Sequence, residues 1–119
     1  MHLNQNEVTI LYNGESPRDK RVIPYAMTIT SKINKQDISS MDISATLFEV
    51  MVEMLGCSPK DLINKADPEY QAKHRGHDYK PKMWFKAIKE NPNLLRAPIA
   101  MHKNKIIICH NPSDVLRLR

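Results

Sequence analysis

The stretch from Asn91 to Leu116, NPNLLRAPIAMHKNKIIICHNPSDVL, carries the signals of two strands and a helix. Ile99–His102 and residues 106–110 are short and apolar, as strands are. Only the tight polar turn HKNK joins them, so the two strands should pair as an antiparallel hairpin. The sequence NPSD predicts a helix that begins near Asn111 and continues to the end of the chain. The stretch therefore predicts a β-β-α unit.

Upstream, the first part of the chain predicts a β-α-β unit. Val8–Tyr12 has the β-branched, apolar character of a strand, and a helix should begin after Ser16. Residues 33–38 alternate between apolar and polar side chains, which indicates a second strand. Since a crossover helix connects them, these two strands should be parallel.

A helical block separates the two units. Its first helix should begin after the N-cap Ser44 and end at Gly56, with a short helix from Ser58 and another over about 82–90. The apolar stripe of the first of these helices contains Leu47, Val50, Met51 and Met54. The order is that of an α/β, thioredoxin-like fold: a mixed four-stranded sheet with a helical insertion, about 44–91, between the second and third strands. We expect one domain over residues 1–119.

One capping pattern occurs three times, as SPRD at Ser16, SPKD at Ser58 and NPSD at Asn111. The cap accepts a backbone N–H, proline occupies the first helical position, and the acid returns a bond to the cap. We therefore expect Ser16 to be a helix cap first of all. Pro24 should kink or shorten the helix that follows, because proline removes a hydrogen bond.

The composition is that of an ordinary globular protein, with 41% hydrophobic and 26% charged residues and a net charge of +5. The start, MHLNQNEVTIL, lacks the pattern of a signal peptide, and no apolar run approaches membrane length. We therefore expect a cytoplasmic protein without a membrane partner. Cys57 and Cys109 form no disulfide framework and no zinc spacing.

Two stretches carry a resemblance to a known family. MLGCSPKDLINKADPEY and the stretch from Asn91 to Leu116 resemble the glutaredoxin-linked arsenate reductases and the related Spx regulators. The likeness extends from about Val8 to Leu118 and implies the fold derived above. It also implies that the peptide bond before Pro98 is cis, and it names RNA polymerase as one candidate partner.

The catalytic positions of that family are substituted here. Its reductases carry a nucleophilic cysteine where this chain has Ser16. Their three oxyanion-binding arginines correspond to Asn64, Ala97 and Asn111. A serine hydroxyl needs a neighbouring general base, and the sequence nominates none. The resemblance thus implies a degenerate reductase site, and we assign no catalytic residue.

Several cations remain near the substituted site. Arg18, Lys20 and Arg21 could hold an anion at the first helix. Arg96 is one residue from an arginine position of the family, but one step along an extended segment reverses the side-chain direction.

Three functions stay open. The leading hypothesis is a non-catalytic binding or regulatory protein, a pseudoenzyme with a protein partner and no cofactor. The alternative is a thiol-dependent oxidoreductase linked to glutathione, with Cys57 as the candidate thiol and Cys109 in a half-buried strand. Nucleic-acid binding through residues 73–89 is disfavoured, because the aromatic side chains there should turn inward. His74 and His77 lack the neighbouring ligands of a metal site.

Overall fold

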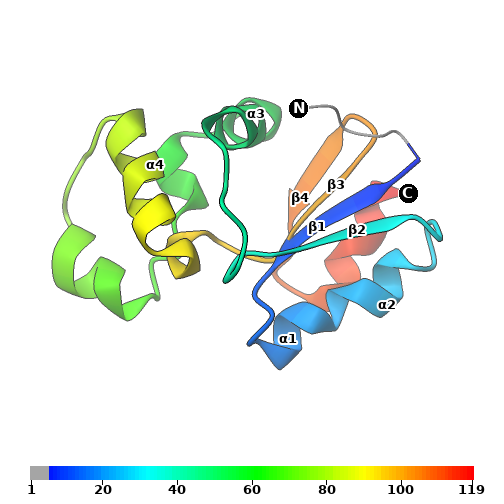
Figure 1. Cartoon of the computed structure of the whole chain (residues 1–119). Helices are drawn as coiled ribbons and strands as arrows, with labels where there is room; N and C mark the ends of the chain where they lie inside the picture. Colours follow the sequence, from blue (N-terminus) through cyan, green and yellow to red (C-terminus); the bar gives the residue numbers. More distant parts are fainter. Residues whose placement is uncertain (1–5) are drawn as a thin grey trace. The chain divides into compact units, whose positions relative to one another are not determined.

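The computed structural model describes residues 6–119, which divide into two compact units. Residues 6–41 and 97–119 form the sheet unit, and residues 42–96 form the helical unit (Figure 1). In the described part of the chain, no helix has both the length and the apolar character needed to cross a membrane.

The sheet unit contains the mixed four-stranded sheet that the sequence predicts. Its order is β2-β1-β3-β4, with β1 and β2 parallel and the other two neighbouring pairs antiparallel. The strands are β1 Val8–Tyr12, β2 Ile33–Asp37, β3 Ile99–His102 and β4 Lys105–Ile108. The last strand ends two residues earlier than expected. Cys109 N still donates to Pro98 O in the β3–β4 register (2.9 Å), but Pro98 has no N–H to return a bond, and His110 N bonds to the carboxylate of Asp114 (2.9 Å).

The first helix is broken, as Pro24 predicts. It consists of α1, Pro17–Lys20, and α2, Val22–Ala26, which meet at Arg21. Pro24 has no N–H with which to bond the carbonyl of Lys20, and its ring crowds that carbonyl. The break therefore lies in the turn that precedes the proline.

One face of the sheet packs against α2 and the C-terminal 3-10 helix η4, Pro112–Leu118. Alternate residues of a strand point to the same face, so Val8 and Ile10 of β1 enter this core together. The buried members of the core are Val8, Ile10, Val22, Ala26, Ala100, Cys109, Val115 and Leu118. Because α2 and η4 pack on the same face of the sheet, this core fixes the positions of both elements within the sheet unit.

The helical unit begins with α3, Ala45–Leu55, which has the ends that the sequence predicts. Ser44 Oγ accepts from Leu47 N (3.0 Å), and Gly56 ends the helix with a φ of 61°, a conformation that glycine adopts without strain. The buried side chains of α3 are Leu47, Phe48 and Met51, while the predicted Val50 and Met54 are half-buried.

Four further elements complete the helical unit: η1 Pro59–Leu62, η2 Tyr70–His74, α4 Pro81–Glu90 and η3 Pro92–Leu94. The sequence predicts η1 and α4. It does not predict η2, a single widened turn of π-helix, because that segment is polar and has no helical apolar period. The inner face of α4 buries Trp84, Ala87 and Ile88.

Candidate functional site

Ser16 occupies the corner where the resemblance places a nucleophile. It is the N-cap of α1, and its Oγ accepts a hydrogen bond from Asp19 N (3.2 Å). The same Oγ lies 3.4 Å from Asp19 Oδ1, longer than the roughly 2.5–3.0 Å of a good O–H···O bond. Asp19 is buried, and its other carboxylate oxygen accepts from Asn13 N (2.9 Å). The hydroxyl is therefore part of the helix cap, as predicted.

The other two predicted caps use the acid more than the cap's side chain. Asp61 Oδ2 accepts from Ser58 N (3.0 Å), and Asp114 Oδ2 accepts from Asn111 N (3.0 Å). Those backbone hydrogen bonds lower the pKa of each carboxyl from its usual value. Ser58 and Asn111 thus begin their helices in capping boxes in which the backbone N–H donates to the acid, and Ser58 Oγ also donates to Asp61 Oδ2 (3.2 Å).

A side chain from α1 reaches the start of η4. Arg18 Nη2 donates to the carbonyl oxygen of His110, the residue that precedes Asn111. This bond joins the start of α1 to the segment just before η4. Three of the four substituted positions, Ser16, Ala97 and Asn111, belong to the sheet unit, and Asn64 belongs to the helical unit. Lys20 and Arg21, the other cations proposed for an anion, are exposed at the far end of α1.

A loop contact that the sequence analysis missed fixes the entry to α1. Gly14 N donates to Asp37 Oδ1 (2.9 Å), and Ser39 donates to the same oxygen from N (3.0 Å) and Oγ (2.7 Å). The Gly14 bond is the largest cause of the lowered pKa of Asp37. A Cβ added at Gly14 would lie 2.0 Å from Asp37 Oδ2, so a larger residue here would displace the carboxylate that accepts from the N–H of residue 14. The only available signal was a lone glycine between a strand and a helix.

The peptide bond between Ala97 and Pro98 is cis, as the resemblance implies. Pro98 is buried and Ala97 is half-buried. A methyl group at position 97 offers no charge and no hydrogen-bond donor to an oxyanion.

Asn64 and Arg96 lie together in the helical unit. With Asp61, Ile63 and Lys65 they line a polar hollow of about 220 Å³. Arg96 Nη1 donates to Asp61 O (3.2 Å), and Asn64 Oδ1 accepts from Ala66 N (3.2 Å). Both side chains therefore tie down neighbouring main chain. Two cations line this hollow, but the guanidinium of Arg96 is already engaged.

Neither thiol is activated by its surroundings. Burial raises the pKa of Cys57, and Asp61 adds to that effect, while Arg96 opposes it more weakly. Burial, followed by Asp114, raises the pKa of Cys109 to about 12. Since the thiolate is the reactive form, both side chains are poor nucleophiles at neutral pH.

The aromatic and histidine side chains of the basic segment pack on one another. His74 Nδ1 lies 3.1 Å from Tyr79 Oη, and the ring of His77 stacks on Tyr79 at 5.2 Å between centroids. Tyr79 packs against Trp84, which is 1% exposed. The aromatic side chains thus turn inward, as expected. Among residues 6–119, no three histidine, cysteine or acidic side chains gather as a metal-binding group.

Comparisons by sequence find nothing: no family model and no curated protein matches this chain. Comparison by structure does. An arsenate reductase from Vibrio cholerae superimposes with a TM-score of 0.84 over 98% of this chain and 100% of that protein, at 16% identity. The chain has the fold of an arsenate reductase.

Other solved structures agree. A Yersinia pestis protein, provisionally assigned as an arsenate reductase, matches with a TM-score of 0.80 and 19% identity, over 92% of this chain and 98% of its own. A protein related to arsenate reductase from Brucella melitensis matches with a TM-score of 0.68 and 12% identity, over 95% and 94%. The resemblance predicted from the sequence is thus confirmed at the level of the fold.

Proposed function

We propose that this chain is a member of the arsenate reductase/Spx family that lacks reductase chemistry and acts by binding a protein partner in the cytoplasm. The observation that supports it best is the use made of Ser16 Oγ. At the position of the family's nucleophilic cysteine, this atom accepts the Asp19 N–H that caps α1. The resemblance to Spx makes RNA polymerase one candidate partner.

The chemistry of a hydroxyl supports the same conclusion. A serine acts as a nucleophile only when a base removes its proton in the reaction. The nearby carboxylate, Asp19, already accepts from Asn13 N, and its approach to Ser16 Oγ is long. The role of the Asp19 carboxylate in holding the start of α1 is enough to explain its position.

The oxyanion positions offer no substitute for three guanidinium groups. Asn64 Oδ1 accepts a hydrogen bond from Ala66 N, and Asn111 is the N-cap of η4. Ala97 has no polar side-chain atom. Neutral groups cannot replace the charge with which arginine binds an oxyanion and stabilises a thiolate.

The test is to compare the wild-type protein with Ser16→Cys. The wild type should reduce arsenate no faster than background when glutathione and glutaredoxin are supplied. Ser16→Cys should alkylate with iodoacetamide faster than Cys57 or Cys109, because the helix start and the neighbouring Arg18 lower a thiol pKa, an effect that the Asp19 carboxylate opposes only in part. It should still reduce arsenate poorly, since the three arginine positions stay empty.

Ser44→Cys is the matched control, because it places a thiol at the N-cap of α3. If the basic residues of α1 contribute, Ser16→Cys should alkylate faster than Ser44→Cys. Clear arsenate turnover by the wild type would refute the proposal. Strong turnover by Ser16→Cys alone would show that Arg18, Lys20 or Arg21 already forms a working anion site.

The second candidate is a glutathione-linked oxidoreductase that uses Cys57. Its support is that Cys57 is only half-buried and that Arg96 acts to lower its pKa, although burial outweighs this effect. Glutathione-dependent turnover that disappears in Cys57→Ser, but not in Cys109→Ser, would favour this candidate over the first.

A further inference from the structure

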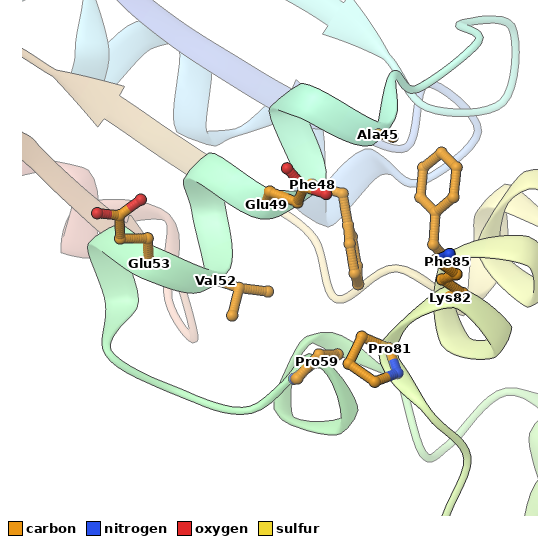
Figure 2. Close-up of a pocket in the computed structure, with 9 residues that line it drawn as sticks. All are labelled: Ala45, Phe48, Glu49, Val52, Glu53, Pro59, Pro81, Lys82 and Phe85. Atoms are coloured by element: carbon orange, nitrogen blue, oxygen red, sulfur yellow. The ribbon is translucent and has the colours of Figure 1, made fainter.

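The helical unit contains an apolar groove that plays no part in the substituted site. It has a volume of about 390 Å³ and lies between α3, the start of η1 and the start of α4 (Figure 2). Its apolar lining comes from Ala45, Phe48, Val52, Pro59, Pro81 and Phe85. In Figure 2, side chains from α3 point toward the two prolines across the groove.

The floor of the groove is held in place by its own packing. Phe48 is 3% exposed, and its ring centroid lies 5.5 Å from that of Phe85. Pro59 and Pro81 occupy the first positions of η1 and α4, where the fixed φ of proline suits a helix start. The groove is therefore preformed, which reduces the entropic cost of filling it.

Charged side chains of opposite sign flank the apolar floor. Glu49 and Glu53 lie one turn apart on α3, and Lys82 comes from α4. All three are exposed, and none of their side chains makes an ion pair or hydrogen bond with the residues that the structure describes. On a chain with a net charge of +5, two adjacent acids without a basic partner leave a negative edge to be complemented.

We infer that this groove binds an amphipathic helix of a partner protein, with its apolar side chains in the groove and its Lys or Arg side chains facing Glu49 and Glu53. The inference rests on the proposed binding function and names the surface that would perform it. From Ala45 to Val52 the groove follows about two turns of α3, or about 10 Å. That length suits apolar side chains spaced three and four residues apart on a docked helix.

The probes are two synthetic amphipathic helices of about four turns with the same leucine stripe. One carries lysines beside the stripe, and the other carries glutamates at the same positions. Fluorescence anisotropy measures their affinity for the wild-type protein. The lysine peptide should bind roughly tenfold more tightly than the glutamate peptide, a difference of about 1.4 kcal/mol.

Variants of the groove locate the effect. Replacing both acids, Glu49→Lys with Glu53→Lys, should reverse the preference between the two peptides. The matched control, Asp78→Lys with Glu90→Lys, makes the same change in net charge at two exposed positions of the helical unit outside the groove. It should leave the lysine peptide preferred. Val52→Asp should weaken the binding of both peptides.

Three results would overturn the inference. The first is equal affinity for the two peptides, or no binding of either at millimolar concentration. The second is a control variant that reverses the preference as the groove variant does. The third is self-association of the wild type that Val52→Asp abolishes, which would make a second copy of the chain the occupant. Arsenate turnover would instead refute the proposed function and leave the peptide result intact.

Discussion

The start of α1 in the sheet unit and the groove of the helical unit use their polar side chains in opposite ways. In the sheet unit, the groups around the start of α1 are engaged with main chain: Ser16 and Asp19 in the cap, Arg18 on the carbonyl of His110. In the helical unit, Glu49, Glu53 and Lys82 border an apolar groove, and their side chains make no ion pair or hydrogen bond within residues 6–119. The polar groups at the start of α1 stabilise the local fold, whereas the charged groups beside the groove remain exposed for the binding that we propose.

The largest expected difference in folding stability is between alanine variants of two neighbouring residues on α3. Met51 is fully buried, so Met51→Ala should destabilise the protein by about 2–5 kcal/mol through lost burial and a cavity. Val52 borders the open groove, so Val52→Ala should cost less than about 1 kcal/mol. Urea unfolding of both variants measures the difference. Equal costs would mean that the groove is filled in solution.

A smaller difference should separate two acids. Asp19→Ala removes a buried carboxylate and leaves Asn13 N without its acceptor, which should cost about 1–3 kcal/mol. Glu49→Ala removes an exposed side chain and should change stability by no more than about 0.5 kcal/mol. Thermal unfolding followed by circular dichroism compares them. If Glu49→Ala were as costly as Asp19→Ala, its carboxylate would have a partner in solution.

The three serine caps should differ in order. Ser16→Ala and Ser44→Ala each remove a hydroxyl that accepts a helix N–H, so each should cost about 1 kcal/mol. Ser58→Ala should cost less, because its backbone N–H keeps its bond to Asp61. Chemical denaturation of the three variants tests this order. A Ser58→Ala cost equal to the other two would show that its hydroxyl caps η1 in solution.

The smallest effect should appear in acid. The pKa of Asp114 is lowered chiefly by the Asn111 N–H, so its carboxylate stabilises the folded state above the ordinary carboxyl pKa of about 3.9. That contribution is lost as pH falls through the lower, folded pKa. The Tm difference between the wild type and Asp114→Asn should therefore shrink below about pH 4. Glu90→Gln, which removes an exposed acid outside any cap, is the control.

Local signals predicted most of the fold. Val8–Tyr12 and Ile99–His102 were predicted with their observed bounds, and Ser44 and Gly56 mark the ends of α3. Each depends on strand composition or on a cap, which neighbouring residues determine. The early end of β4 was not predictable from its own residues, because it depends on Pro98, which lies opposite Cys109 and has no N–H to return a hydrogen bond.

In the candidate site too, features that depend on neighbouring residues were predictable, and features that depend on distant residues were not. The sequence alone determined that Ser16 replaces a cysteine and follows a capping pattern, because both are properties of the residue and its neighbours. Only the tertiary structure showed why a glycine suits position 14, since the reason is the close approach of Asp37, on another strand. It alone also revealed the groove, because Phe48 and Phe85 belong to different helices and meet only after the chain has folded. Contacts between residues distant in sequence produce no hydrophobic periodicity along the chain, so the sequence pattern could not predict them.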